Sequence, residues 1–260
     1  MFQDKVCVVT GGALGIGRCL TREFAKAGAK IAFIDKNEEA GKENERVLKG
    51  YGSQILFMPG DLAVEQTLHQ FVNSVIEEYG SVDYLINNAF FTMGGIHTPC
   101  SYEDFNMALK VGVTAPYMLT QLFLPFFNKG ASVVNISSSR AFMSQRNTES
   151  YTAAKGGITA LTHSLAVSLS GQVRVNSIAP GWIDTGATYE DGYMAEHSEE
   201  DIGQHPSNRV GDPMDIARAV MFLCDERNSF INGENITIDG GMSKLMIYNG
   251  DDGWEYHPNK

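Results

Sequence analysis

Short runs of apolar and β-branched residues alternate with helix-patterned segments along most of this chain. The runs lie at residues 6–10, 31–35, 55–58, 84–86, 132–137, 173–178 and 235–238. Helical patterns fill the intervals, with one ending near Ala27 and others at 37–50, 64–79, 102–127, 150–169 and 213–225. Apolar strands separated by helices are typical of a parallel sheet that is covered on both faces. The sequence therefore predicts an α/β fold, a doubly wound parallel sheet of the Rossmann type in a single domain.

That domain is expected to span residues 1–245, because no repeat, low-complexity segment or linker divides the chain. Residues 182–209 show no clear periodicity. A long irregular loop in a compact domain is usually a lid or a binding loop, so we expect a substrate lid there. The tail at 246–260 carries Tyr248, Trp254 and Tyr256, whose rings solvate poorly. We expect this extension to dock at a subunit interface.

Charge and cysteine content exclude several classes of function. The 260 residues carry 20 Lys and Arg against 31 Asp and Glu, a net charge of −11, whereas a nucleic-acid surface needs clustered cations. We therefore expect no nucleic-acid partner. Cys7, Cys19, Cys100 and Cys224 lack metal-ligand spacing, so we expect no metal site, a reducing compartment, and core positions for Cys7 and Cys224. No signal-peptide pattern or membrane-length apolar stretch is present, which predicts a cytoplasmic protein with no membrane partner.

A glycine-rich loop separates the first predicted strand from the first helix. Its spacing is Gly-x-x-x-Gly-x-Gly, rather than the commoner Gly-x-Gly-x-x-Gly of dinucleotide-binding proteins. One alternative is that the glycines form a tight turn and nothing more. However, the N-terminus of the following helix offers N–H groups and a positive dipole end to a pyrophosphate. We expect the loop to bind a dinucleotide. The expected contacts are Gly11, Leu14, Gly15, Ile16 and Gly17.

Asp35 ends the second predicted strand, 18 residues after Gly17. A carboxylate at this place can accept hydrogen bonds from both ribose hydroxyls of an adenosine, whereas a 2′-phosphate would meet like charge. The position favours NAD over NADP as cofactor. Lys36 weakens this preference, since its ammonium could bind the 2′-phosphate of NADP. The alternative for Asp35 is a helix N-cap ahead of Asn37 and Glu38.

Tyr151 and Lys155 are four residues apart on a predicted helix and therefore share one face. Tyrosine is a poor base at neutral pH, but a nearby ammonium and an oxidised nicotinamide both favour the phenolate. Tyr151 could then take the proton of an alcohol, or return it to a carbonyl oxygen. Ser138 follows the run at 132–137, at the sheet edge where ligands of such folds bind, and could hold the substrate oxygen. The alternative is a surface pair without chemistry.

These motifs together resemble the short-chain dehydrogenase/reductase family over essentially the whole chain. The matching residues are Thr10-Gly11-x-x-x-Gly15-x-Gly17, Asp61-Leu62, Asn87-Asn88-Ala89, Ser138, Tyr151-x-x-x-Lys155, Asn176, Pro180-Gly181-Trp182-Ile183-x-Thr185 and Asp239-Gly240-Gly241. The resemblance implies an NAD(P)-dependent oxidoreductase acting on an alcohol or ketone, commonly as a homodimer or homotetramer.

Further cofactor contacts are implied by the resemblance alone. Asp61, beside Leu62, would hold the adenine amino group, and Asn88 and Ala89 would line the adenosine side. The segment that begins Pro180-Gly181 would place Ile183 and Thr185 on the nicotinamide carboxamide. Lys155 would also bind the nicotinamide ribose.

The chain departs from the family pattern at two positions. Phe90 stands where the family usually has the glycine of Asn-Asn-Ala-Gly, and we expect its ring to reshape the entrance near the cofactor. Gly112 stands where the family commonly has an asparagine that bends the long helix and anchors a water for proton exchange with Lys155. Glycine tolerates the bend but offers no side-chain carbonyl, while Pro116 removes a helical N–H. We expect a working but altered proton relay.

The substrate is constrained only loosely by the sequence. Arg140 could receive a carboxylate or phosphate, with a solvated ion pair as the alternative. Phe90 and neighbouring apolar residues suggest an apolar substrate of hydroxysteroid size or smaller, and Tyr189 is a candidate wall residue of the lid. One alternative activity is reduction of a 3-oxoacyl thioester. Another is a non-catalytic dinucleotide-binding sensor, if the change at Gly112 abolished turnover.

Overall fold

The computed structural model describes residues 2–189, 192–246, 248 and 250. Seven parallel strands form one sheet in the order β3-β2-β1-β4-β5-β6-β7. The strands are β1 (Val6–Thr10), β2 (Lys30–Asp35), β3 (Ile55–Pro59), β4 (Val82–Asn87), β5 (Phe127–Ile136), β6 (Arg174–Pro180) and β7 (Asn235–Ile238). The α/β doubly wound fold expected from the sequence is confirmed. Strand order reverses between β1 and β4, which is where such sheets bind ligands.

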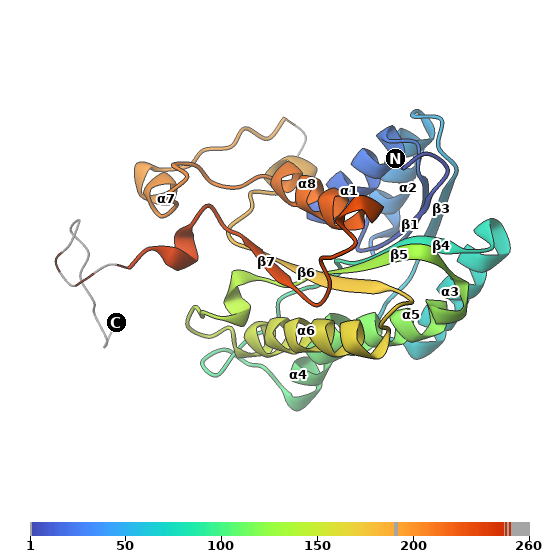
Figure 1. Ribbon diagram of the computed structural model, residues 1–260. Helices are drawn as coiled ribbons and strands as arrows, with labels where there is room; N and C mark the ends of the chain where they lie inside the picture. The colour runs from blue at the N-terminus through green and yellow to red at the C-terminus, as the bar shows by residue number, and fades with distance from the viewer. Residues whose placement is uncertain (1, 190–191, 247, 249, 251–260) are drawn as a thin grey trace.

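Helices cover both faces of the sheet (Figure 1). One face carries α1 (Gly15–Lys26), α2 (Glu38–Lys49) and α8 (Pro213–Cys224). The other carries α3 (Glu65–Tyr79), α4 (Tyr102–Leu109), α5 (Ala115–Phe123) and α6 (Glu149–Ser168). The short α7 (Glu199–Gly203) lies beyond the sheet, inside the expected lid. Sequence periodicity missed α7, although its start has a capping box in which Ser198 and Asp201 satisfy each other's backbone N–H.

Successive strand residues face two different cores. Val8 and Leu85 point to the core beneath α3, α5 and α6, while Val9 and Ile86 point to the core beneath α1 and α8. All four side chains are fully buried. The expectation that Cys7 and Cys224 are core residues is confirmed, since both are fully buried thiols in the α8-side core. Burial of both strand faces explains why the strands appear in the sequence as continuous apolar runs.

The long helix expected at 102–127 is interrupted, which corrects the sequence prediction. A π-helical turn, Lys110–Thr114, separates α4 from α5, and the Ala115 N–H bonds to the carbonyl of Lys110, five residues back. Pro116 has no N–H to give the Gly112 carbonyl, so the ordinary α-helical bond is impossible at that point. Gly112 and Pro116, the residues from which the sequence predicts an irregular helix, therefore coincide with a one-turn π bulge.

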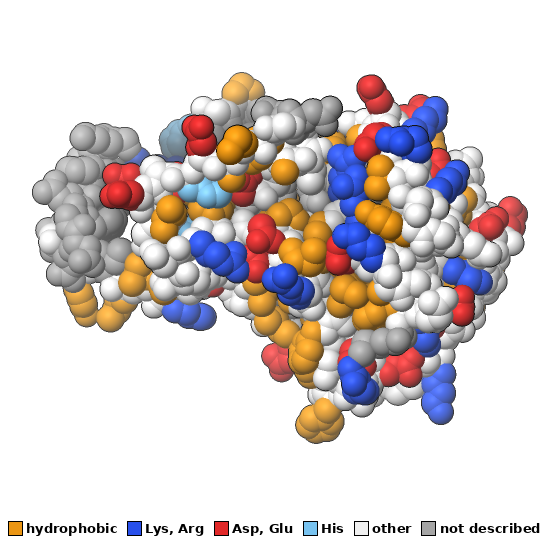
Figure 2. Space-filling view, turned by 90° about the horizontal axis from the view of Figure 1, so that it is seen from above, with side chains coloured by type: hydrophobic (Ala, Val, Ile, Leu, Met, Phe, Trp, Pro, Cys, Tyr) orange, Lys and Arg blue, Asp and Glu red, His pale blue; other side chains and the backbone are white. Residues whose placement is uncertain are grey.

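One described helical stretch, Tyr102–Phe126, is long and apolar enough to cross a membrane by length and composition. In the fold it packs against α3 and α6 and contributes fully buried residues such as Leu119 and Phe123 to the core. Core helices of this kind pass the same test, so the stretch carries no argument for a membrane span. The opposite face of the molecule carries interspersed charges of both signs (Figure 2). On α2 these include the pairs Lys42–Glu38 and Lys49–Glu45.

Leu119→Ala tests the packing of the interrupted helix. Leu119 is fully buried on α5, so we expect the substitution to lower the free energy of unfolding by about 2 to 5 kcal/mol, through lost burial and a residual cavity. Urea unfolding measures this directly. The matched control Val167→Ala changes a side chain that is 77% exposed, and its effect should stay within about 0.5 kcal/mol. Equal effects of the two substitutions would contradict the assigned core.

Candidate active site

A cavity of about 1220 Å³ lies at the carboxyl ends of the strands. It is bounded by the loops that follow the first six strands, β1 to β6, together with part of the lid. The residues expected at the site that line it are Gly11, Leu14, Gly15, Ile16, Asp35, Asp61, Leu62, Asn88, Ala89, Phe90, Ser138, Arg140, Tyr151, Lys155, Pro180, Gly181, Ile183, Thr185 and Tyr189. The fold thus brings together side chains that are spread over most of the sequence.

Gly17 is the expected cofactor contact that lies outside this lining. A Cβ on Gly17 would stand 1.9 Å from the Gly11 carbonyl oxygen and 2.6 Å from Nδ2 of Asn88. Glycine at this position therefore serves the close approach of α1 to the loops after β1 and β4. Gly15, by contrast, lines the cavity with a φ of +57°, a left-handed conformation that favours glycine.

Side-chain hydrogen bonds clamp the loops after β1 and β4 together. Nδ2 of Asn88 donates to the carbonyls of Thr10 and Gly11, at 3.0 and 3.1 Å. The Thr10 hydroxyl oxygen accepts from the backbone N–H groups of Asn88 and Ala89, at 2.9 and 3.1 Å. Asn88 therefore shapes the wall of the cavity through backbone contacts. The role of Thr10 in this clamp was not anticipated, because it depends on a residue 78 positions away.

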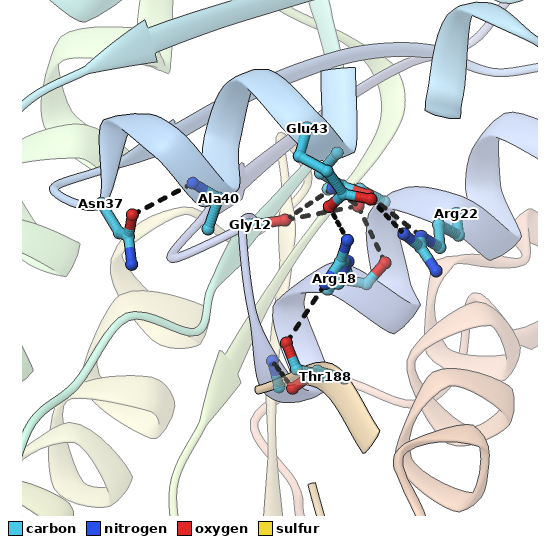
Figure 3. Close-up of polar contacts among 10 residues, drawn as sticks. Gly12, Arg18, Arg22, Asn37, Ala40, Glu43 and Thr188 are labelled. Atoms are coloured by element: carbon cyan, nitrogen blue, oxygen red, sulfur yellow. Dashed lines mark hydrogen bonds and ion pairs between the residues drawn. The ribbon is translucent and has the colours of Figure 1, made fainter. Parts of the chain in front are cut away.

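The start of α1 also contacts the lid (Figure 3). Leu14 at the N-cap has no side-chain oxygen to cap the first turn, and the Gly15 N–H donates to the hydroxyl of Thr188 at 2.8 Å. Arg18 donates to the Thr188 carbonyl at 3.1 Å and pairs with Glu43 on α2. The lid thus reaches the glycine loop through Thr188, a residue that no sequence pattern singled out.

Asp35 stands at the end of β2 with its carboxylate held from two sides. Its Oδ2 accepts from the Ala13 N–H at 3.0 Å, and its Oδ1 accepts from the Asn37 N–H at 2.9 Å. The alternative role as helix cap is wrong, because the N-cap of α2 is Asn37, whose side chain accepts from the Ala40 N–H (Figure 3). Lys36 turns its ammonium over the ring of Phe91, at 4.5 Å from the centroid.

These features fit a nicotinamide dinucleotide. The first turn of α1 opens on the cavity, and its N-cap residue Leu14 has no capping side chain. Apart from the Gly15 N–H, which donates to Thr188, the N–H groups of this turn suit a pyrophosphate. The carboxylate of Asp35 lies in the same cavity, at the place where an adenosine ribose binds in such sheets. At the other end of the cavity lie the polar side chains of Ser138, Tyr151 and Lys155.

Ser138 and Tyr151 both follow β5 in the chain, one in the loop directly after it and one on α6. Ser138 is 6% exposed and caps the 3-10 turn Ser139–Ala141, with its Oγ accepting from the Arg140 N–H at 3.1 Å. Within the described part of the chain no acceptor is paired with the Ser138 O–H, so this group can donate. Tyr151 lies in the first turn of α6, half-buried, with the Arg140 guanidinium carbon 5.1 Å from its ring centroid.

Lys155 is buried one turn further along α6, only 4% exposed. Its Nζ donates to the carbonyl oxygen of Ile136, the last residue of β5, at 2.8 Å. Burial lowers the pKa of Lys155 from 10.5 to about 7. The ammonium is therefore poised to lose its proton near neutral pH, which is a property of groups that take part in proton transfer.

The lid contributes less to the cavity than its sequence suggested. Tyr189, the expected wall residue, lines the cavity, whereas the neighbouring Tyr193 and His197 both bond to Oδ2 of Asp184, each at 2.9 Å. Two lining residues of this region, Asp201 and Gln204, were not anticipated. Asp201 belongs to the capping box of α7, so that motif was the available signal.

The comparisons with known proteins agree with this geometry. A family model described as enoyl-(acyl carrier protein) reductase matches residues 11–243. An uncharacterized oxidoreductase of Thermotoga maritima is 41% identical over 254 residues, which cover 95% of this chain and 99% of that protein. The chain belongs to the short-chain dehydrogenase/reductase family. It is therefore an NAD(P)-dependent oxidoreductase of the class that acts on CH–OH groups.

Two further relatives show how far the family likeness extends. L-fucose dehydrogenase of Mus musculus is 35% identical over 254 residues, covering 92% of this chain and 89% of the mouse protein. The solved structure of an apo SCOR enzyme from Clostridium thermocellum superposes with a TM-score of 0.85 at 41% identity, covering 98% of both chains. The fold and the family are thus shared over nearly the full length of each relative.

The buried ammonium of Lys155 should leave a signature in the pH dependence of stability. Between the folded pKa of about 7 and the unfolded value of 10.5, the unfolded chain holds a proton that the folded chain has lost. The free energy of unfolding therefore rises with pH across this window. Below the window the buried amine is charged in the folded chain, and the whole cost of burying that charge lowers the stability. Lys155→Met removes that cost. The free energy of unfolding of the variant should exceed that of the wild type most near pH 6. This excess should shrink by about 2 to 4 kcal/mol by pH 10.

Urea unfolding of both proteins across this pH range measures the difference, in which other titrating groups cancel. The control Lys110→Met alters an exposed lysine on the π turn, and its difference from wild type should stay within about 0.5 kcal/mol. A pH-independent difference for Lys155→Met would contradict the assigned burial of the charge.

Proposed function

We propose that this protein is an NAD(H)-preferring oxidoreductase that interconverts a secondary alcohol and a ketone. The observation that carries the proposal is one cavity that holds the N-terminus of α1, the Asp35 carboxylate and the Ser138, Tyr151 and Lys155 side chains. When bound, the nicotinamide supplies the acceptor or donor of the hydride. The residues of the chain bind and orient the reactants and move the proton.

Tyr151 is proposed as the acid/base. Its phenol oxygen would take the alcohol proton during oxidation and return it to the carbonyl oxygen during reduction. The charge of Lys155, one turn along the same helix, favours the phenolate, and Lys155 would also bind the nicotinamide ribose. The O–H of Ser138 would donate to the substrate oxygen and hold it beside Tyr151.

The cofactor contacts proposed for the remaining lining residues follow the shape of the cavity. Gly11, Leu14, Gly15 and Ile16 would hold the pyrophosphate at the start of α1, with Gly17 acting through the packing of that helix. The adenosine end would lie against Asp35, Asn88 and Ala89, with Asp61 and Leu62 at the adenine. The nicotinamide end would lie against Pro180, Gly181, Ile183 and Thr185.

NAD is proposed over NADP because of the charge beside the adenosine ribose. Asp35 offers hydrogen-bond acceptors to ribose hydroxyls and repels a 2′-phosphate. Lys36, the cation that could offset this, lies over the Phe91 ring. The ammonium is thus engaged by an aromatic face, which supports the preference for NAD.

The proposed substrate is a small molecule with an apolar body, of hydroxysteroid size or less. Phe90, Phe91 and Met143 line the cavity near the acid/base pair, and Arg140 beside Tyr151 could receive an anionic group. A polyhydroxylated substrate is the second candidate. Ser144, Gln145 and Gln204 line the same cavity, and a relative 35% identical is an L-fucose dehydrogenase.

The assembly as a homodimer or homotetramer, the cytoplasmic location and the docking of the tail stay predictions. In the tail, residues 247, 249 and 251–260 lie outside the described residues.

Tyr151→Phe tests the acid/base assignment. The substitution keeps the ring and removes the proton-bearing oxygen, so we expect kcat to fall by about 10²- to 10⁴-fold. The dissociation constant of NADH, measured by fluorescence titration, should change less than about threefold. Retention of wild-type turnover would refute the assignment. Loss of NADH binding together with turnover would mean that the variant reports binding rather than proton transfer.

Asp35→Ala tests the preference for NAD. Removing the carboxylate takes away charged hydrogen-bond acceptors, so we expect kcat/KM for NAD to fall by about 10- to 100-fold. The value for NADP should rise, because the repulsion of the 2′-phosphate is gone. Initial rates with both cofactors measure the ratio, and Asp4→Ala provides a control at an exposed carboxylate near the N-terminus. An unchanged ratio would rule out the ribose role of Asp35.

A further inference from the structure

Phe90 lies beside both members of the acid/base pair, and the inference drawn from it rests on the proposed function of that pair. Its ring meets the Tyr151 ring edge-on, with centroids 5.0 Å apart and an interplanar angle of 86°. Its centroid is also 4.7 Å from Nζ of Lys155. One side chain from the loop after β4 therefore contacts both groups that would move the proton.

Gly112 makes this position of the ring possible. A Cβ on Gly112 would stand 2.7 Å from Cε2 of Phe90 and 2.9 Å from Cβ of Ala154 on α6. Both distances are shorter than Cβ contacts in folded proteins, so a side chain at position 112 would require the Phe90 ring or the neighbouring helix α6 to shift. The two residues thus depend on each other, although they are 22 positions apart and belong to different elements.

Of the two described aromatic rings near the buried ammonium, Phe90 is the nearer, at 4.7 Å from Nζ against 5.7 Å for Tyr151. Nζ of Lys155 has one backbone acceptor, the Ile136 carbonyl, and burial disfavours its charged form. An aromatic face within about 6 Å attracts a cation, more strongly when the cation is desolvated. Described charged groups also lie near these rings. The Arg140 guanidinium is 5.1 Å from the Tyr151 centroid, and the Lys36 ammonium is 4.5 Å from the centroid of Phe91, which stacks on Phe90.

We propose that Phe90 is a positioning residue of the acid/base pair. Its ring, admitted by Gly112, holds the Lys155 ammonium on its face and fixes the Tyr151 ring by an edge contact. Substitution of the ring should then disturb proton transfer while leaving dinucleotide binding in place. Phe90 acts through Lys155 and Tyr151, and no bond to the substrate is required of it.

The first experiment measures the pKa of Lys155 without turnover. Competitive acetylation, followed by mass spectrometry of the peptide that carries Lys155, gives the pKa of that one amine in the full-length protein. Phe90→Leu keeps apolar bulk against water but removes the ring, so the Lys155 pKa should fall by about 0.5 to 1. Phe90→Tyr retains a ring face and should restore the wild-type value. An unchanged or higher value in the leucine variant, or no restoration by tyrosine, overturns the proposal.

The second experiment measures turnover in the same variants. Phe90→Leu should lower kcat by about 5- to 30-fold with a near-normal NADH dissociation constant. Phe57→Leu, which removes a ring from a stacked core pair with Phe33, controls for the loss of a phenyl group. A leucine variant with wild-type kcat overturns the proposal. If the wild type itself lacks turnover, the proposed function fails, and the acetylation experiment still decides the role of the ring.

Gly112→Ala tests the dependence between the two positions. The added methyl should push the ring away from Lys155 and lower both kcat and the Lys155 pKa, in the direction of Phe90→Leu. In the Phe90→Leu background the same alanine should add little, since no ring remains to be displaced. Effects that add in full in the double variant overturn the assigned contact.

Discussion

The hydrogen bond from Nζ of Lys155 to the carbonyl of Ile136 is the contact on which the site depends. It joins α6 to the end of β5, so it fixes Lys155 and, one turn earlier, Tyr151 relative to the sheet edge that carries Ser138. Burial takes the ammonium out of water at this position, which costs stability and lowers the pKa of Lys155 toward neutrality. The burial that lowers the stability of the fold also brings the pKa of Lys155 into the range in which the amine can take part in proton transfer.

The position of the cavity follows from the order of the strands. Chain connections run outward in both directions from the boundary of β1 and β4, so the loops after these strands separate there. Hydrogen bonds of Asn88 with the Thr10–Gly11 backbone close the base of that gap. Gly17 allows α1 to start directly above them. The dinucleotide end of the cavity is thus shaped largely by backbone geometry, and the reactive end by side chains from the loop after β5 and from α6.

Much of the fold was predictable because its strands are buried on both faces, and such strands stand out as apolar runs. The bounds of β1 and β7 agree with the sequence prediction residue for residue. The glycine loop, Asp35 and the Tyr151–Lys155 pair follow from local spacing. What local spacing could not reveal are contacts between distant residues, such as Thr188 on Gly15 or Phe90 against Gly112. In the sequence the two departures from the family pattern are unrelated positions, whereas in the structure the Phe90 ring occupies space that a side chain at position 112 would need.

The most direct test of the account is turnover itself. Initial rates for a panel of secondary alcohols, hydroxysteroids and sugars, each with NAD and with NADP, would be followed by absorbance of the reduced cofactor. The account predicts reduction of NAD in preference to NADP with at least one alcohol of the panel. Tight binding of NADH without turnover on any of them would contradict it and would instead favour a dinucleotide-binding sensor.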